Sequence, residues 1–350
     1  MNPMSASLAR RHGIPGLRPA PLLLALLLIA AVVSVLCGAV PVSAQDWLAG
    51  FHSGELSGGG YVLWNIRLPR ALFAILVGAA LGISGALTQG LFRNPLADPG
   101  LLGVSSGATC AAALTIVVFS GMALPLPPAL RMWLLPIAAL GGAFLVCMAL
   151  DRVARWITPG SIAGLLLTGV ALNSLSMAVV GLCTYLASDE QLRSLSFWTL
   201  GSLAGAGWLQ VAVLGSILAA ALWQVRRMLM AMNALALGEA AAQHVGINVG
   251  RLRGQVVLLV ALLTGFAVAW SGLIGFVGLI APHMVRTWLG ADQRQVLPLA
   301  GLVGGLLLLV ADTVARTIAI PAEIPVGIFT ALLGAPFFLF LLRSARSRIG

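Results

Sequence analysis

The stretch from Arg67 to Gly107 reads RLPRALFAILVGAALGISGALTQGLFRNPLADPGLLGVSSG. From Ala71 it runs for about twenty apolar, glycine-rich residues, the length that crosses a hydrocarbon core of about 30 Å. It breaks at Asn94-Pro95 and again at Asp98-Pro99-Gly100, before a second apolar run begins. Proline and glycine end a helix where its backbone can find water or protein partners. The stretch therefore predicts a membrane helix, a turn and the start of another membrane helix.

Four segments of this stretch, in this order, resemble the signature of the FecCD family of permeases: RLPR (67–70), VGAALGISGA (77–86), NPLADPG (94–100) and LLGVSSGA (101–108). Members of that family are the membrane subunits of bacterial ABC importers for haem, ferric siderophores and cobalamin. The resemblance extends over about residues 60 to 342. It implies an all-α integral membrane protein in which ten transmembrane helices surround a central pathway in a homodimer.

The composition places the chain in a membrane without help from the resemblance. Of its 350 residues 60% are hydrophobic and only 9% are charged, with a mean hydropathy of +1.03, whereas a soluble domain carries about 25% charged residues. All 20 basic residues are arginine. Because a Walker A phosphate loop needs a lysine, that motif is absent and the ATPase subunit of an ABC system is excluded on this ground.

Ten apolar runs follow one another along the chain, at about 20–43, 68–92, 101–120, 133–150, 161–187, 208–224, 253–270, 274–289, 297–319 and 325–342. They predict a single transmembrane domain over 20–342, with cytoplasmic tails at 1–19 and 343–350. Val42-Ser43-Ala44 also fits a signal peptidase site. We prefer an uncleaved first helix, because its apolar core of about 20 residues exceeds the 7 to 15 of a signal peptide.

The arginines test this topology. The net charge of +10 could indicate nucleic acid binding, but the arginines lie mostly between apolar runs, where the positive-inside rule places them. With a cytoplasmic N-terminus, the inner side holds fifteen arginines and the outer side five: Arg67, Arg70, Arg131, Arg193 and Arg316. The asymmetry favours a multi-pass membrane protein with both termini in the cytoplasm, and the resemblance implies that the membrane is the bacterial inner membrane.

A weak internal repeat accompanies the ten runs. Five residues recur at an offset of 187: Gly78, Ser84, Gly85, Pro95 and Gly103 match Gly265, Ser271, Gly272, Pro282 and Gly290. In a ten-helix topology the two copies run in opposite directions through the membrane, and inverted repeats commonly build a pathway at their interface. The high glycine content makes some of these matches fortuitous.

Three of the outer arginines are candidate docking residues. Arg67 and Arg70 lie three residues apart at a helix start, so they share one face, and Arg316 comes late in the ninth apolar run. Snorkelling to lipid head groups is the simple alternative. In the resembled family, arginines of the RLPR motif and before the last helix receive glutamates of the periplasmic substrate-binding protein. The resemblance therefore implies docking by Arg67, Arg70 and Arg316.

On the predicted cytoplasmic side, LGEAAAQHVGINVGRLR (237–253) is a long polar stretch. Gly238 and Gly246 flank a run of good helix formers, which predicts a short helix, although a solvated loop fits as well. This region, about 234–250, resembles the coupling segment with which ABC permeases contact their ATPase, carried here by Glu239, Ala240, Ala241 and Gly246. The resemblance likewise implies a cytoplasmic gate at Asn94 and Leu96, while Asn94 alone also explains a helix stop.

Other chemical sites are sparse in the sequence. Asp312 and Arg316 lie four residues apart and can form an ion pair, which makes Asp312 a structural partner rather than a proton carrier. The four cysteines are scattered and have no CxxC spacing, and the four histidines form no pair suited to a metal or haem. We therefore expect no catalytic residue, no metal site and no cofactor in this chain, with ATP and Mg²⁺ held by the partner ATPase.

Three functions were compared. The first is the permease of an ABC importer that works with a second copy of itself, two ATP-binding cassette subunits and a periplasmic substrate-binding protein. An ion-coupled secondary transporter would show more acidic residues in mid-membrane, and a membrane enzyme would show clustered His, Asp or Glu. By its similarity to haem permeases, notably in SDEQLRSLSFWTLGSL (188–203) and GFVGLIAPHMVRTWLGAD (275–292), haem is the expected cargo. A ferric siderophore is the second choice and cobalamin the third.

Overall fold

A computed structural model describes residues 19–49, 58–119, 127–159 and 161–346, and these residues are helical apart from short connections. Residues 1–18 of the predicted tail at 1–19 and residues 347–350 of the predicted tail at 343–350 lie outside the described residues, and 343–346 belong to the last helix. The helices of the first half are α1 (Pro19–Leu36), α2 (Ala44–Ala49), α3 (Gly58–Tyr61), the π-helix η1 (Val62–Arg67), α4 (Leu68–Phe92), the 3₁₀ turn η2 (Pro99–Leu102), α5 (Val104–Leu114), the π-helix η3 (Thr115–Phe119) and α6 (Pro128–Ile157). Those of the second half are α7 (Ile162–Leu186), α8 (Asp189–Leu200), α9 (Trp208–Ala236), α10 (Glu239–His244), α11 (Val249–Ser271), α12 (Val277–Leu289), α13 (Gln293–Thr317) and α14 (Val326–Arg346).

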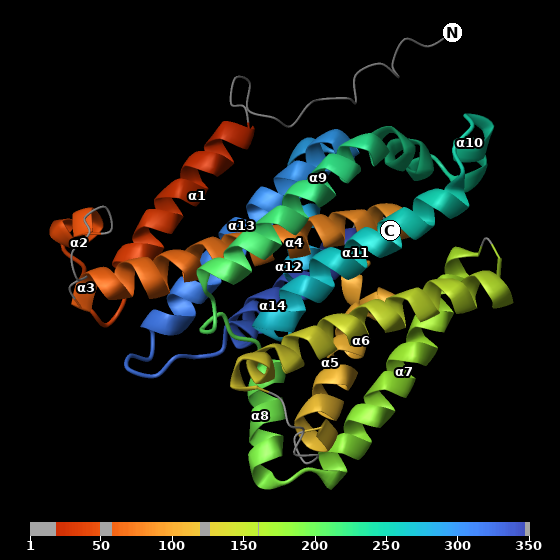
Figure 1. Cartoon of the computed structure of the whole chain (residues 1–350). Coiled ribbons are helices and arrows are strands. Elements are labelled where there is room, and N and C mark those ends of the chain that lie inside the picture. The colour runs from red at the N-terminus through yellow and green to blue at the C-terminus, as the bar shows by residue number, and fades with distance from the viewer. Residues whose placement is uncertain (1–18, 50–57, 120–126, 160, 347–350) are drawn as a thin grey trace.

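Helix α4 is the centre of the bundle, and most of its residues are buried. It packs against α9, α11, α12 and α13, which surround it in Figure 1. The packing is backbone to backbone: a Cβ added at Gly78 would overlap the carbonyl group of Gly304 on α13, and one at Gly85 would overlap that of Gly278 on α12. Small residues allow this close approach between membrane helices, so the glycines of the opening stretch build the core.

Seven of the described helices are long and apolar enough to cross a membrane, which makes the chain a multi-pass membrane protein. They are α1, the continuous helix from Gly58 to Phe92, and α6, α7, α9, α11 and α13. The other three predicted runs overlap α5, α12 and α14, of which α5 and α12 are short, with 11 and 13 residues. At a rise of about 1.5 Å per residue, the 13 residues of α12 extend about 20 Å, less than a hydrocarbon core. The count of ten spans stays a prediction.

Two ends of the molecule can be distinguished in Figure 1. One end carries α2 and α3, and the opposite end carries α10. Helix α4 begins near the first end, where its π-helical extension η1 follows α3. By the arginine count of the sequence, the α2–α3 end corresponds to the predicted outer side and the α10 end to the predicted cytoplasmic side.

The internal repeat extends only in part to the local structure. Gly85 lies within α4, whereas its counterpart Gly272 ends α11 with a φ of 67°. Pro95 lies in the turn after α4, whereas Pro282 lies inside α12. The stretch 189–193, on the predicted outer side, is the start of helix α8. Ser188 and Gln191 form a capping box that fixes this helix start.

Candidate functional site

The three predicted docking arginines lie where the end of α1, the start of α4 and the end of α13 meet. Arg67 closes η1, Arg70 is in the first turn of α4, and Arg316 is in the last turn of α13. The structure therefore brings together residues that are almost 250 positions apart in the sequence. Each guanidinium, however, already has partners within the chain.

Arg67 holds the C-terminal end of α1. Its Nη1 donates to the carbonyl oxygens of Val35 and Leu36 at 3.1 and 3.3 Å, and its Nη2 donates to that of Val40 at 2.6 Å. Only 6% of Arg67 is exposed. The last carbonyl groups of a helix have no partner within the helix, and a cation at that end also interacts favourably with the helix dipole. Arg67 is thus a cap for α1.

Arg316 reaches the same helix end from α13. It donates to the carbonyl oxygen of Cys37 at 2.8 Å and to both oxygen atoms of Ser34. Its Nε lies 3.6 Å from Asp312 Oδ2, so the predicted Asp312–Arg316 pair is present. This contact is the longer of the two ion pairs that Asp312 makes.

Arg70 lies between two carboxylates. Its Nε donates to both oxygens of Asp312 at 3.2 and 3.1 Å, and its Nη2 donates to Asp312 Oδ1 at 2.9 Å. Its Nη1 donates to the two oxygens of Glu323 at 3.0 and 2.8 Å. A planar guanidinium that serves two carboxylates in this way is a strong, directional contact. The contact ties the start of α4 to α13 and to the connection between α13 and α14.

The three arginines, Asp312 and Glu323 are called the arginine cluster below. Its side chains face one another, and little of each guanidinium is open to a partner. The predicted outward-facing patch is therefore largely internal in this structure. Docking by these arginines stays a prediction, and it requires that one of their present contacts be exchanged.

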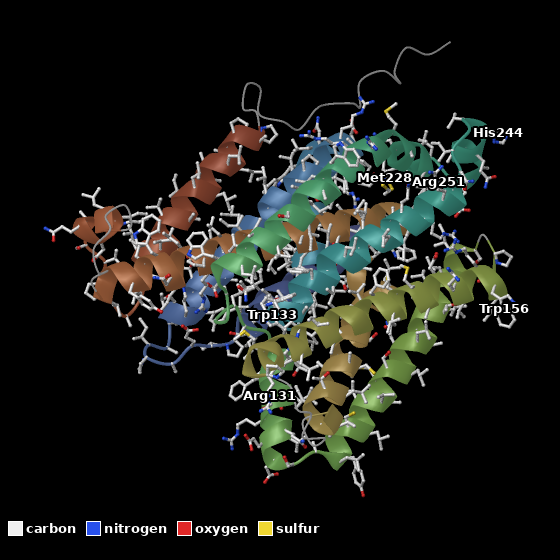
Figure 2. The ribbon with its side chains drawn as sticks, viewed as in Figure 1. Arg131, Trp133, Trp156, Met228, His244 and Arg251 are labelled. Atoms are coloured by element: carbon white, nitrogen blue, oxygen red, sulfur yellow. The ribbon has the colours of Figure 1, made fainter. Side chains whose placement is uncertain are left out.

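The coupling segment is a short helix, as the sequence predicts. Helix α10 covers Glu239–His244, with Gly238 before it at a φ of 121° and Gly246 after it at a φ of 84°. Both glycines adopt backbone conformations that other residues rarely take. Ala242 is buried, whereas Ala240 and Gln243–Val245 are exposed. Figure 2 shows His244 and Arg251 at this end of the molecule.

An ion pair fixes α10 to the long helix that follows it. Arg253 on α11 is buried, and its Nη2 lies 3.7 Å from Glu239 Oε1. A force applied to α10 therefore reaches α11, which packs against α4, α6 and α9. The role of Glu239, Ala240, Ala241 and Gly246 toward an ATPase is not tested by this geometry.

The predicted gate residues lie in the turn after α4. Arg93 ends that helix in a left-handed conformation with a φ of 50°. The Oδ1 atom of Asn94 accepts from the backbone N–H of Leu96 at 2.9 Å, an Asx turn that accounts for this break. Asn94 is exposed and Leu96 is half-buried. A gate at this position stays a prediction.

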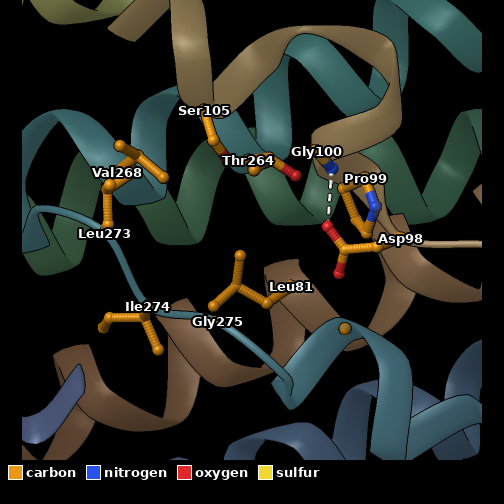
Figure 3. Close-up of a pocket in the computed structure, with 11 residues that line it drawn as sticks. Leu81, Asp98, Pro99, Gly100, Ser105, Thr264, Val268, Leu273, Ile274 and Gly275 are labelled. Atoms are coloured by element: carbon orange, nitrogen blue, oxygen red, sulfur yellow. Dashed lines mark hydrogen bonds between the residues drawn. The ribbon is translucent and has the colours of Figure 1, made fainter. Parts of the chain in front are cut away.

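A pocket of about 190 Å³ lies between two breaks in the helices, and sequence reasoning missed it. One break is the connection from α4 to η2 and contributes Asp98; the other, from α11 to α12, contributes Gly275 (Figure 3). Asp98 Oδ1 accepts from Gly100 N–H at 2.7 Å. The Thr264 hydroxyl, in a residue 2% exposed, has no hydrogen-bond partner among the described residues and points toward the Asp98 turn.

Burial raises the pKa of the Asp98 carboxyl, and the bond from Gly100 N–H only partly opposes this shift. The pocket is smaller than the 300 Å³ or more of a typical site for a drug-sized ligand. It has room for a few water molecules, so we do not assign it to a bulky cargo. Among the described residues, no group of three His, Cys, Asp or Glu is arranged to hold a metal ion.

Comparison with known proteins finds similarity along nearly the whole chain. The FecCD transport family matches residues 26–344. The hemin transport system permease protein HmuU of Yersinia pestis is 44% identical over 333 residues, which cover 94% of this chain and 96% of that protein. The vitamin B12 import system permease protein BtuC of Escherichia coli O9:H4 (strain HS) is 38% identical over 340 residues, which cover 97% of this chain and 99% of that protein.

Solved structures are also similar to most of this chain. One, described as an inward-facing conformation of a metal-chelate type ABC transporter, superposes with a TM-score of 0.80 at 34% identity and covers 93% of this chain and 100% of that one. PsaBC from Streptococcus pneumoniae in complex with Fab superposes with a TM-score of 0.55 at 16% identity, covering 80% of this chain and 92% of that one. At that low identity the second match reports the fold alone.

Proposed function

The chain belongs to the FecCD transport family and is a permease subunit of an ABC importer, and we propose that its cargo is haem. The observation that carries this proposal is the 44% identity with a hemin permease over 94% of the chain, against 38% with a vitamin B12 permease. Haem passes, in this proposal, from a periplasmic binding protein into the cytoplasm. A ferric siderophore or cobalamin is the alternative cargo within the same family.

The energy for transport comes, in this proposal, from two separate ATP-binding cassette subunits that hold ATP and Mg²⁺. Helix α10 is the contact for them, because it projects from the bundle and is linked to α11 through the Glu239–Arg253 pair. The chain has no lysine for a Walker A loop. Closure of the ATPase subunits moves α10, and α11 carries this movement toward α4.

A second copy of the chain completes the pathway in this proposal. Helix α7 and the side chains described for α14 support it, because both expose large apolar residues: Leu167, Leu175, Leu182 and Tyr185 on α7, and Leu332, Leu333 and Leu339 on α14. Such faces meet lipid or another apolar face. We place the dimer in the bacterial inner membrane, with both termini in the cytoplasm as the arginine distribution indicates.

The arginine cluster receives carboxylates of the binding protein in this proposal. The cluster carries three arginines and two carboxylates, so a positive charge remains at the α2–α3 end of the molecule. Complementary charge steers the encounter of two proteins and fixes their register. Because Arg67 is engaged with the end of α1, Arg70 rather than Arg67 donates to the incoming carboxylate in this proposal.

The test of the cargo is haem-stimulated ATP hydrolysis by the reconstituted transporter. The permease, its ATPase subunits and its soluble binding protein are combined in vesicles, and haem, a ferric siderophore and cobalamin are compared at equal concentration. Haem should raise the ATPase rate most, because only the loaded binding protein with the correct cargo completes the cycle. A larger response to cobalamin or to the siderophore would contradict haem as cargo while leaving the class of transporter intact.

A further inference from the structure

The two carboxylates that Arg70 binds differ in their surroundings. Asp312 is on α13 and its side chain is 1% exposed, whereas Glu323 is in the connection before α14 and its side chain is 46% exposed. Removing one partner of a buried pair leaves an uncompensated charge and is strongly destabilising. An ion pair contributes less where solvent reaches it, and Glu323 is the solvent-exposed partner of the buried Arg70. Asp312 is thus the fixed partner of Arg70, and Glu323 is the exchangeable one.

The Nη1 edge of Arg70 is bound by the more exposed of its two carboxylates, so it lies nearer to solvent than the edge bound by Asp312. The Nε and Nη2 atoms face the buried Asp312, while Nη1 faces both oxygens of Glu323. A guanidinium edge matches a carboxylate in shape and charge. A glutamate of an incoming protein would make the same contacts as Glu323, so the two compete for one position.

Glu323 lies in the connection before α14, so its contact with Arg70 links this connection to α4. Glu323 lies three residues before Val326, the first residue of α14. The start of α14 is packed closely on its other side, because a Cβ at Gly327 would overlap the carbonyl of Leu200 and lie 2.9 Å from that of Leu273. The Arg70–Glu323 contact therefore joins α4 to a connection whose next residues abut α8 and the break between α11 and α12.

We propose that Glu323 is an internal carboxylate that occupies the docking position of Arg70 until a glutamate or aspartate of the substrate-binding protein displaces it. The exchange replaces one carboxylate by another on Arg70 and releases the connection before α14 from α4. Asp312 stays bound throughout and keeps Arg70 in place. The inference rests on the proposed docking function of the arginine cluster.

The first test compares the affinity of the binding protein for the wild-type transporter and for Glu323→Gln. The permease is assembled with its ATPase subunits in nanodiscs, and binding of its soluble substrate-binding protein is measured at low and high salt. The amide keeps the size of the side chain but loses the charge that competes. Affinity should rise about fivefold at low ionic strength, the factor that corresponds to about 1 kcal/mol for one competing ion pair, and the gain should shrink as salt screens the charges.

Two further variants separate the possible failures. Glu190→Gln is the matched control, because Glu190 is an exposed carboxylate of α8 and makes no ion pair among the described residues; its affinity should equal that of the wild type. Arg70→Gln should weaken binding. If Arg70→Gln weakens binding but Glu323→Gln does not strengthen it, the proposed role of Glu323 as a competitor is rejected. If Arg70→Gln has no effect, the docking function itself fails.

A second measurement needs no partner protein. Phenylglyoxal modifies guanidinium groups that are open to solvent, and peptide mass spectrometry reports the modification of Arg70 alone. Modification of Arg70 should be faster in Glu323→Gln than in the wild type, while Glu190→Gln has no effect. Equal rates in all three proteins would show that Glu323 does not cover this edge. Melting temperatures of the variants show whether each is folded before its rate is interpreted.

Discussion

At the scale of single residues, Arg67 stabilises the end of α1 by donating to its last two carbonyl groups and to that of Val40, just beyond it. We expect Arg67→Gln to lower the stability by about 1–3 kcal/mol, because carbonyls near this helix end lose a charged donor in a buried place. Thermal unfolding of the purified permease in detergent measures the change. Arg193→Gln removes an exposed arginine of α8 and should leave the melting temperature unchanged.

A melting temperature of Arg67→Gln equal to that of the wild type would contradict the capping role. Such a result, combined with a loss of binding-protein affinity, would support the docking function that the family resemblance implies for Arg67. The two roles are therefore distinguished by stability and affinity measured on the same variant.

Asp98 gives a pH dependence whose sign follows from its burial. Burial raises its pKa in the folded protein, so between the ordinary value of about 3.9 and the raised value the folded state binds more protons than the unfolded state. The contribution of Asp98 to stability therefore falls as pH rises through this window. Asp98→Asn keeps an acceptor for Gly100 N–H without the charge.

We therefore expect Asp98→Asn to have a higher melting temperature than the wild type at pH 7.5, because burial penalises the charged carboxylate and not the amide. The gain should diminish as the pH of the measurement is lowered toward about 4. A variant that is less stable than the wild type at pH 7.5 would indicate that the charge of Asp98 has a favourable partner in the pocket.

Residue patterns in the sequence predicted the coupling helix but not the partners of Arg70. The flanking Gly238 and Gly246 predicted α10, because glycine marks both ends of a run of helix formers. The partners of Arg70 could not be predicted, since Asp312 and Glu323 are 242 and 253 positions away. The sequence pairs Asp312 with its neighbour Arg316, whereas the fold gives Asp312 its shorter contact to Arg70.

At the scale of elements, the coupling helix depends on the backbone conformation of Gly246. A Cβ at this position meets no atom within 4 Å, so space does not require a glycine; the φ of 84° does. A β-branched residue is strained in this conformation by about 1–2 kcal/mol, whereas asparagine tolerates it. Gly246→Val should therefore shift α10, and Gly246→Asn should leave it in place.

We expect Gly246→Val to lose most ATP-driven uptake while its amount in the membrane stays normal, and Gly246→Asn to keep most of the uptake. Uptake by vesicles and the quantity of inserted permease are measured in parallel. Normal uptake by Gly246→Val would separate α10 from coupling, and equal loss in both variants would point to contact with the side-chain position rather than to backbone strain.

Helix boundaries were predicted well where hydropathy and breaks coincide. The run 68–92 matches α4, and 161–187 matches α7 within one residue at each end. The run 20–43 overshoots α1, which ends at Leu36, because apolar residues continue past the point where Gly38 and Pro41 stop the helix. The run 208–224 stops short of Ala236, since hydropathy falls at Arg226 and Arg227 while α9 continues.

At the scale of the whole molecule, α4 organises the bundle through glycines that allow α12 and α13 to approach its backbone. The opening stretch of sequence thus determines both the family and the core. The number of membrane crossings could not be obtained in the same way, because hydropathy does not distinguish a complete crossing from the short helices α5 and α12. The exposed apolar faces of α7 and α14 leave the arrangement of a second copy to experiment.

Haem uptake by proteoliposomes tests the central claim most directly. The permease is reconstituted with its ATPase subunits facing the vesicle interior. ATP is enclosed inside the vesicles, and haem-loaded binding protein is added outside. We predict uptake that requires both ATP and the ATPase subunits and that persists when a proton uncoupler is added. Haem uptake by the permease without any ATPase subunit, or its collapse on adding the uncoupler, would contradict an ABC-driven haem importer.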